Sequence, residues 1–521
     1  MLPAIRPSLF IPILLFALGM ETATAVRAQV RIGSRRELFV DDYLVARMQA
    51  IEFRLHRPVS RELVWKQSNQ TNGKWWSGSN RSVSVFRDGK LYRMYYRDYA
   101  KVRKPWIIKD GFGDENIACC YAESKDGIHW ERKPINRYGT KDLKVNNIIW
   151  AGTGATNFAV FKDANPRCKP AARYKAIGRV MYQANKDPDP PKRDRTGYKW
   201  LPRCGLLAFQ SPDGIRWSPM QTKRIIKKGE FDSHNVAFWD PARKRYVSFI
   251  RIWQPNEARI RDVAMLTSAD FLNWSDPPTW LKYKRASKRI GTKPASLTHL
   301  YDNNIMTYYR APHLILGFPM RLIDGRVRVR NNPLANETAV NDTGFMSSRD
   351  GVHFRRWREA FMRPGPYSGR WWNENNCIAW GMVETKSHIA GAPNELSFYA
   401  NEYYGSARSN LRRYTLRLDG FVSLHAGETG EVVTKPLSFT GKQLSMNFAT
   451  SGIGSVRVEL QEASGKPIPG FTLQDCGEIF GDSINERVRW KRGSDVSRLA
   501  GKPIRIRFVM QDADIWSIRF H

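Results

Sequence analysis

The chain has 521 residues, which is enough for two domains and a large buried core. That size excludes a small disulfide scaffold: pairing of some of the six cysteines stays open, but buried free thiols are favoured for most. A formal net charge of +35, spread along the whole chain, favours anionic partners. Because no nucleic-acid-binding motif occurs, an acidic or sulfated glycan fits this charge better than nucleic acid.

Residues 1–28 have the pattern of a secretory signal peptide. Arg6 supplies the positive region, Leu9–Leu18 the apolar region, and Val26-Arg-Ala28 a cleavage site with small residues. The apolar run is short for a membrane span, and no later stretch approaches about 20 apolar residues. We therefore expect a protein exported to the periplasm or the exterior; an uncleaved N-terminal anchor is the alternative.

After the signal, residues 35–44 and 53–58 predict a leading strand, and the pair Asp41-Asp42 is typical of a turn. A loop rich in Asn, Gly and Trp follows, in which Trp75 and Trp76 are candidates for stacking on sugars.

A short pattern then occurs four times: Ser, any residue, Asp, usually Gly, and an aromatic residue three positions after the Gly. The copies begin at Ser124, Ser211, Ser268 and Ser348. Asp-Gly is a hairpin signal, because Asp caps the turn and Gly adopts positive φ. The aromatic residues Trp130, Trp217 and Trp274 are expected in the core. Repetition at intervals of 87, 57 and 80 residues indicates a repeat architecture.

Three β-rich segments precede each copy, so that each unit predicts a four-stranded antiparallel sheet, the blade of a β-propeller. A fifth unit can be built from residues 377–383, 396–401 and 411–418, with Asp419-Gly420-Phe421 as a degenerate turn. From about Pro436, short alternating strands predict a β-sandwich. The expected fold is all-β: a five-bladed propeller over residues 29–430, then a sandwich over residues 431–521.

This layout resembles the propeller glycosidases of glycoside hydrolase families 32 and 43. The chain also resembles a group of exported bacterial proteins of unknown activity, through the segments 36–43, 231–239, 310–314 and 480–482. The glycosidase resemblance implies a sugar in the central funnel and three carboxylates from different blades, because one carboxyl must be protonated while another is ionised. The family's Trp-Met-Asn-Asp-Pro-Asn-Gly signature is absent, and residues 77–82, which lack a carboxylate, take its place.

On this resemblance, Asp232 is the first candidate for the base or nucleophile, with a turn residue as the alternative. Glu402 is the candidate acid, because flanking aromatic residues could raise its pKa, and Glu374 is its rival. Asp262, in a partial match to the Arg-Asp-Pro signature, is either an orienting acid or a structural ion-pair partner.

Candidate substrate-binding residues lie beside these acids or at other strand ends. His234 and Asn235 follow Asp232 directly, guanidinium groups suit anionic substituents, and tryptophans suit sugar rings. The set is His234, Asn235, Arg97, Arg251, Arg310, His313, Trp371 and Trp372.

Three functional hypotheses result. The first is a secreted glycoside hydrolase with a carbohydrate substrate, which could be anionic; the others are a non-catalytic carbohydrate-binding propeller and a cell-envelope interaction protein. No metal ligands can be named, and no cofactor is expected.

Overall fold

The structure is a computed structural model that describes residues 29–66, 81–99, 102–109, 111–112, 117–140, 145–182, 204–254, 260–283, 289–290, 293–294, 299–329, 339–406 and 408–521. The predicted signal peptide and the tryptophans Trp75 and Trp76 lie outside these residues. Within them the chain is all-β: strands and three short 3₁₀ turns are present, and no α-helix. The same residues contain no helix long and apolar enough to cross a membrane. The predicted fold class is confirmed.

Five sheets share a path of four antiparallel strands each, as the repeats predict. The first contains β6 (Ser84–Asp88), β7 (Leu91–Tyr99), β9 (Ile117–Ser124) and β10 (Trp130–Arg132), with β11 (Ile148–Ala151) added to β9. The second contains β12 (Ala159–Lys162), β13 (Tyr174–Tyr182), β14 (Cys204–Ser211) and β15 (Ser218–Pro219), with β8 (Gly111–Phe112) added to β13. The third contains β16 (Val236–Asp240), β17 (Arg245–Trp253), β18 (Arg261–Ser268) and β19 (Thr279–Trp280).

The fourth sheet contains β23 (Ile305–Tyr308), β24 (Ala311–Gly317), β27 (Met346–Ser348) and β28 (Phe354–Arg356). A small sheet of β22 (His299–Leu300), β25 (Met320–Asp324) and β26 (Ala339–Thr343) extends this unit, and β20 (Arg289–Ile290) pairs with β21 (Lys293–Pro294). The fifth contains β29 (Val383–Thr385), β30 (Glu395–Glu402), β31 (Asn410–Arg417) and β5 (Val59–Lys66).

The repeated Ser-x-Asp-Gly sequence forms the turn between the third and fourth strands of the first four sheets. In every copy the serine hydroxyl accepts a hydrogen bond of 2.9 Å from the backbone N–H three residues later. The Asp Oδ1 accepts from the two N–H groups that follow the turn, at 2.7 to 2.9 Å. Phe271, at φ +72°, replaces the glycine in the third copy. Trp217 is buried, whereas Trp130 and Trp274 are partly buried against the core.

The first strands of the sheets pack against one another in a ring. β6 contacts both β12 and β29, and β16 contacts both β12 and β23. Between the fourth and fifth sheets, the Asn304 amide donates to the Ile378 carbonyl at 2.7 Å, and the Trp380 indole donates to the Ile305 carbonyl at 2.9 Å. Each sheet therefore has an inner strand on a common central axis, which is the arrangement of a propeller.

The fifth sheet differs from the prediction in how it ends. After β31 the chain does not turn back at Asp419-Gly420-Phe421 but continues into β32 (Val422–Thr434), which belongs to the second lobe. The N-terminal β5 supplies the missing fourth strand, with Leu411 opposite Trp65. A strand from the N-terminal part of the chain therefore closes the ring, and it is Val59–Lys66, not the predicted leading segment before Pro58.

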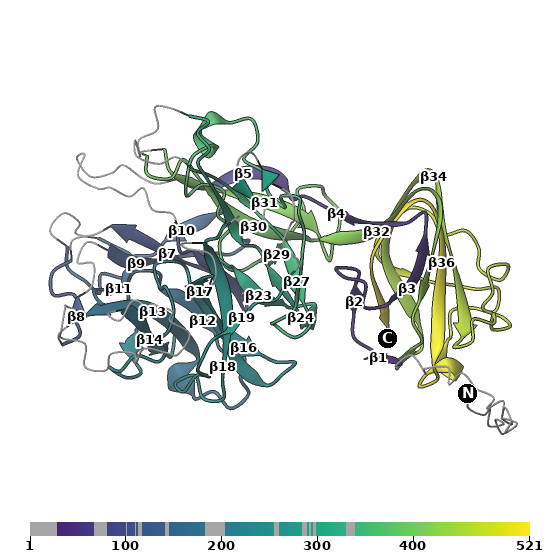
Figure 1. The fold of residues 1–521 in the computed structure, drawn as a ribbon, viewed down its shortest axis with the longest axis horizontal. Helices are drawn as coiled ribbons and strands as arrows, with labels where there is room; N and C mark the ends of the chain where they lie inside the picture. Colours follow the sequence, from purple (N-terminus) through teal and green to yellow (C-terminus); the bar gives the residue numbers. More distant parts are fainter. Residues whose placement is uncertain are drawn as a thin grey trace, which may run out of the picture.

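The second lobe is one strongly bent sheet around its own apolar core (Figure 1). Its longest strands are β34 (Leu444–Glu462) and β36 (Ile504–Phe520). Each is continuous where the alternating pattern predicts two short strands, at 444–448 and 455–460 for β34 and at 504–509 and 515–520 for β36. A register shift between Thr450 and Ser455 bends β34 and separates its two halves. β33 (Leu437–Phe439) and β35 (Asp482–Arg487) complete its C-terminal part.

The N-terminal strands also belong to this second lobe, which corrects the predicted boundary at residue 29. β1 (Val30–Gly33) pairs with β33, β2 (Glu37–Leu38) with β36, and β3 (Val45–Gln49) and β4 (Glu52–Leu55) with β32. The boundary at residue 431 falls inside β32. Sequence patterns alone could not place these strands, because their partners lie almost 400 residues away or more.

Buried charges join the two lobes. Asp419, fully buried, receives Arg310 Nε at 2.8 Å from the propeller, and Arg36 Nη1 from the sandwich lies 3.3 Å from it. Glu37 similarly contacts Arg349 Nη1 at 2.9 Å and His313 Nε2 at 3.3 Å. Arg310 and His313 were predicted to bind substrate, but the structure places them at this interface between the lobes.

Candidate functional site

The candidate site lies where the inner strands begin, and the buried Arg81, just before β6, is at its centre. Its Nη2 donates to Asp302 Oδ2 at 2.6 Å, and Nη1 forms an ion pair with Glu374. Asp302 precedes β23, and Glu374 belongs to the segment that leads into the fifth sheet. Burial alone would lower the pKa of Arg81, but the two carboxylates raise it well above its usual value. One guanidinium thus joins three of the five sheets.

Asp302 is buried, and both oxygens of its carboxylate are bound by groups of the protein. Besides Arg81, it accepts the backbone N–H of His234 at 2.9 Å and the Cys377 thiol at 3.3 Å. Burial alone would raise the pKa of Asp302, but Arg81 and these hydrogen bonds hold it at about 2. Asp302 therefore stays ionised and fixes the third, fourth and fifth sheets around Arg81.

A second charged group lies at the start of the third sheet. Asp232 forms an ion pair with Arg251 Nη1 while 47% of its side chain remains exposed. Glu230, two residues earlier, is buried, and its Oε2 lies 3.8 Å from Arg251 Nη2. Burial raises the pKa of Glu230 to about 7, Arg251 opposes this rise, and the Asp232 charge adds to it. A carboxyl that is half protonated near neutral pH therefore lies beside an exposed carboxylate.

Tyr301 connects the two groups. The guanidinium of Arg81 lies 4.9 Å from the centre of its ring, and that of Arg251 lies 5.8 Å away. Burial raises the pKa of the Tyr301 hydroxyl; Arg81 lowers it, and Glu374 and Asp232 raise it further. Both carboxylates are thus close enough to act on the same phenol. Asp232 and Glu374, on sheets three and five, lie around one half-buried aromatic ring.

Two predicted sugar ligands are buried beneath this surface. His234 is 2% exposed, and its ring is nearly perpendicular to the Trp380 ring, 6.2 Å away between centres. Burial is the main reason why the pKa of His234 is lowered to about 4, so the imidazole is neutral at neutral pH. Asn235 uses its side chain for the backbone, accepting from Arg251 N at 2.9 Å and donating to the Ser233 carbonyl at 2.9 Å. These contacts give Asn235 a structural task at the strand start.

The two other predicted acids are held by structural partners. Glu402 is buried between Arg412, whose Nε donates at 2.8 Å, and Arg370, at 3.6 Å. Asp262 is buried and accepts hydrogen bonds from Gln254 at 2.8 Å and Tyr283 at 2.9 Å. Their carboxylates complete polar networks within the blades, which favours the structural alternative for Asp262 and favours Glu374 over Glu402 as the candidate acid of the fifth sheet.

Three remaining predicted residues border the site around Tyr404. Arg97 donates to the Tyr404 hydroxyl at 3.4 Å, and the charges of both Glu374 and Arg97 act on that phenol. Trp372 is buried and donates to the Tyr404 carbonyl at 3.0 Å. Trp371 is half-buried, with its indole bound to the Gly365 carbonyl at 2.7 Å. Arg97 thus belongs to the site, and Trp372 supports its wall.

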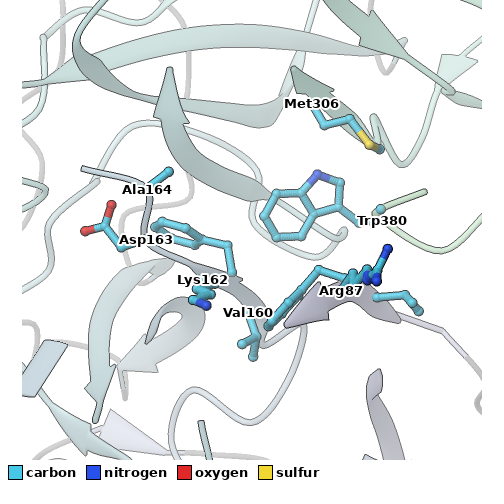
Figure 2. Close-up of a pocket in the computed structure, with 11 residues that line it drawn as sticks. Arg87, Val160, Lys162, Asp163, Ala164, Met306 and Trp380 are labelled. Carbon is cyan, nitrogen blue, oxygen red and sulfur yellow. The ribbon is translucent and has the colours of Figure 1, made fainter. Parts of the chain in front are cut away.

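A cavity of about 360 Å³ lies farther along the central axis (Figure 2). Trp380 contributes to its lining together with Val160, Met306 and Lys162. Trp380 also contacts the His234 ring, with 6.2 Å between the ring centres, so this indole touches both the cavity and the buried layer beneath the charged cluster. Asp163, the carboxylate at the cavity, is bound to Lys175 and to the Tyr246 hydroxyl. None of the carboxylates around Tyr301 lines this cavity.

The sequence interpretation missed Arg81, Glu230, Tyr301 and Asp302. A local signal existed for Glu230, because residues i and i+2 of an extended segment point to the same side, and Glu230 and Asp232 are so spaced. No local signal marked Arg81, whose partners lie 221 and 293 positions later. Among the described residues, no group of three or more His, Cys, Asp or Glu side chains is arranged to hold a metal ion.

Comparison with known proteins gives only distant likenesses. No family model and no curated protein sequence matches the chain. An N-acetylgalactosamine deacetylase from F. plautii aligns at 12% identity over 70% of this chain and 96% of its own, with a TM-score of 0.40. A family 43 arabinoxylan arabinofuranohydrolase from Bacillus subtilis aligns at 10% identity over 88% and 99%, with a TM-score of 0.36.

A family 32 β-fructofuranosidase from Bombyx mori aligns at 9% identity over 91% of this chain and 95% of its own, with a TM-score of 0.37. At such scores these likenesses support no conclusion about activity. The assignment of a propeller rests on the strand order and the packing of the inner strands.

Proposed function

We propose that the chain is a glycoside hydrolase that cleaves a polysaccharide or oligosaccharide beside Tyr301. The observation that supports this proposal is the placement of Asp232 and Glu374 around that ring, each held by one arginine. Glycoside hydrolysis needs two carboxyl groups across the scissile bond, in opposite protonation states. Glu230, with its pKa of about 7, supplies the proton that one member of such a pair requires.

The two sides of Tyr301 differ in their chemistry. Glu230 and Asp232 are like charges on one guanidinium, and the pair retains a proton near neutral pH. In this proposal the proton held by Glu230 reaches the leaving oxygen through Asp232, the solvent-accessible member, as the glycosidic C–O bond breaks, and Glu230 is left ionised. Glu374, held by Arg81, either attacks the anomeric carbon or takes a proton from the water that does. This assignment reverses the roles expected from the sequence, in which Asp232 is the base or nucleophile and Glu374 the rival acid.

Arg81 supports one competing function, a propeller that binds carbohydrate without cleaving it. Arg81 begins the first inner strand, close to the segment where the resembling families have a catalytic carboxylate. A cation there cannot act as a base. In the proposed hydrolase Arg81 instead orients Glu374, and the ionised carboxylate comes from the fifth sheet.

The decisive experiment measures reducing-sugar release from neutral, uronic and sulfated polysaccharides by the wild type, Asp232→Asn and Glu374→Gln. Glu52→Gln, which removes an exposed carboxylate of the second lobe, is the matched control. We expect one glycan to be cut, the control to retain activity, and both site variants to lose at least about 100-fold while their circular dichroism is unchanged. Binding of a glycan without cleavage by the wild type would establish the binding propeller instead.

A further inference from the structure

The third sheet carries an arginine that the proposed mechanism does not use. Arg261, at the start of β18, is half-buried, and its guanidinium lies 5.2 Å from the centre of the Trp253 ring and 4.6 Å from that of Tyr301. Its Nη1 contacts His299 Nδ1 at 3.2 Å. Within the described part of the chain, no carboxylate lies within ion-pair distance of Arg261, and its buried Nε has no hydrogen-bond partner.

The surroundings of Arg261 are unfavourable for an isolated cation. Burial lowers its pKa; Tyr301 opposes this, and the positive charge of Arg251 lowers it further. Arg251 stacks on the same Trp253 ring at 4.8 Å and is itself buried, and its carboxylate partner Asp232 is partly turned to solvent. A buried charge without an ion-pair partner costs free energy, so Arg261, which contacts the same aromatic ring as a second guanidinium group, favours the binding of an anion.

We infer that Arg261 and Arg251, positioned by Trp253 and Tyr301, form a subsite for an oxyanion carried by the glycan, a sulfate ester or a uronic carboxylate. Guanidinium groups bind such oxygens through paired N–H donors, and the aromatic rings hold them in orientation. The inference rests on the proposed function in one respect: it takes the oxyanion to be part of the sugar that reaches Asp232.

Charge balance around Tyr301 supports the same interpretation. Arg81 is compensated by Asp302 and Glu374, and Arg251 by Asp232, whereas Glu230 is half protonated near pH 7. Arg261 is therefore the one cation of this group without a carboxylate at ion-pair distance among the described residues, and Asp232 and Asp324 raise its pKa only from farther away. A neutral sugar would cover Arg261 without neutralising its charge, whereas an anionic sugar would form an ion pair with it.

Isothermal titration calorimetry with small probes tests the subsite without requiring catalysis. The probes are glucuronate and glucose 6-sulfate, with glucose as the neutral counterpart, inorganic phosphate as a free oxyanion, and KCl to match ionic strength. The proteins are the wild type, Arg261→Gln and Arg457→Gln. Arg457 is an exposed arginine of the sandwich, so both substitutions remove one positive charge and only one removes the subsite.

We expect one or both sugar-borne anions to bind the wild type and Arg457→Gln alike, and to bind Arg261→Gln about ten- to a hundredfold more weakly. Equal weakening in both variants would show general attraction to a protein of net charge +35 and would overturn the inference. So would binding of neither anion, or of glucose as tightly as the anions. Preferential binding of inorganic phosphate would overturn the assignment to a glycan substituent. Because binding alone is measured, a protein that cuts no glycan could still pass this test.

Discussion

Replacing Glu230 by glutamine should make the protein more stable at alkaline pH. Glu230 has a pKa of about 7 in the folded chain against an ordinary value of 4.5, because burial disfavours its carboxylate form. Its folded-state pKa is raised, so its contribution to stability is present below pH 4.5 and is lost as the pH rises through 7. A glutamine does not titrate and escapes this loss.

The size of the effect follows from the shift. A difference of one pKa unit corresponds to about 1.4 kcal/mol, and most of the interval between 4.5 and 7 is crossed between pH 5 and pH 8. Allowing for some solvent access, the free energy of unfolding of Glu230→Gln should rise relative to the wild type by about 2 kcal/mol over that range.

Urea unfolding at pH 5 and pH 8, followed by tryptophan fluorescence, measures this double difference and cancels any effect of the amide that is independent of pH. Glu52→Gln is the control, because Glu52 is exposed in the second lobe. If the free energy of unfolding changes equally between pH 5 and pH 8 in Glu230→Gln and in the wild type, the pKa of Glu230 is not raised. The proposed mechanism would then lose its proton source.

Three further predictions concern stability. Asp419→Asn should destabilise the chain by about 3 to 5 kcal/mol in urea, because it leaves buried arginines unpaired, whereas exposed Asp482→Asn should cost less than about 1 kcal/mol. Gly214→Ala, at φ +81° and with a hydroxyl 2.5 Å from the new Cβ, should lower the melting temperature far more than Gly89→Ala, at φ +63° in open space; similar shifts would contradict this. The pKa of His234 is depressed to about 4, so the wild type should lose roughly 3 kcal/mol between pH 7 and pH 4 that His234→Gln retains, and equal acid unfolding curves would argue against it.

Local chemistry made most of the fold predictable. Each Ser-x-Asp-Gly turn contains its own donors and acceptors within three residues, as the hydrogen bonds to Ser211 and Asp213 show. The motif therefore predicts a hairpin turn in each of its four copies. The same local chemistry explains why the predicted fifth turn does not form. Asp419 has no serine two positions before it, and its carboxylate binds arginines from distant segments instead.

The site was less predictable because its contacts are distant in sequence. Asp232 and Glu374 were found by residue type and position, but Arg81, which organises the cluster, carries no motif. Arg310 was assigned to the wrong end of its blade. It lies in the turn between the first and second strands, whereas the site lies where the first strands begin. In an antiparallel sheet these two positions are at opposite ends of the first strand, so the strand order alone places Arg310 away from the site.

The way in which β5 closes the ring also constrains how the molecule can be made. Val59–Lys66 leaves the ribosome among the first residues of the chain, yet its partner β31 is synthesised some 350 residues later. The early strands β1 and β2 wait still longer for β33 and β36. Neither lobe can therefore be completed before its late strands are made, and the early strands keep unpaired edges until then. A chain truncated near its C-terminus would lose the sandwich and leave these strands free to associate with other molecules.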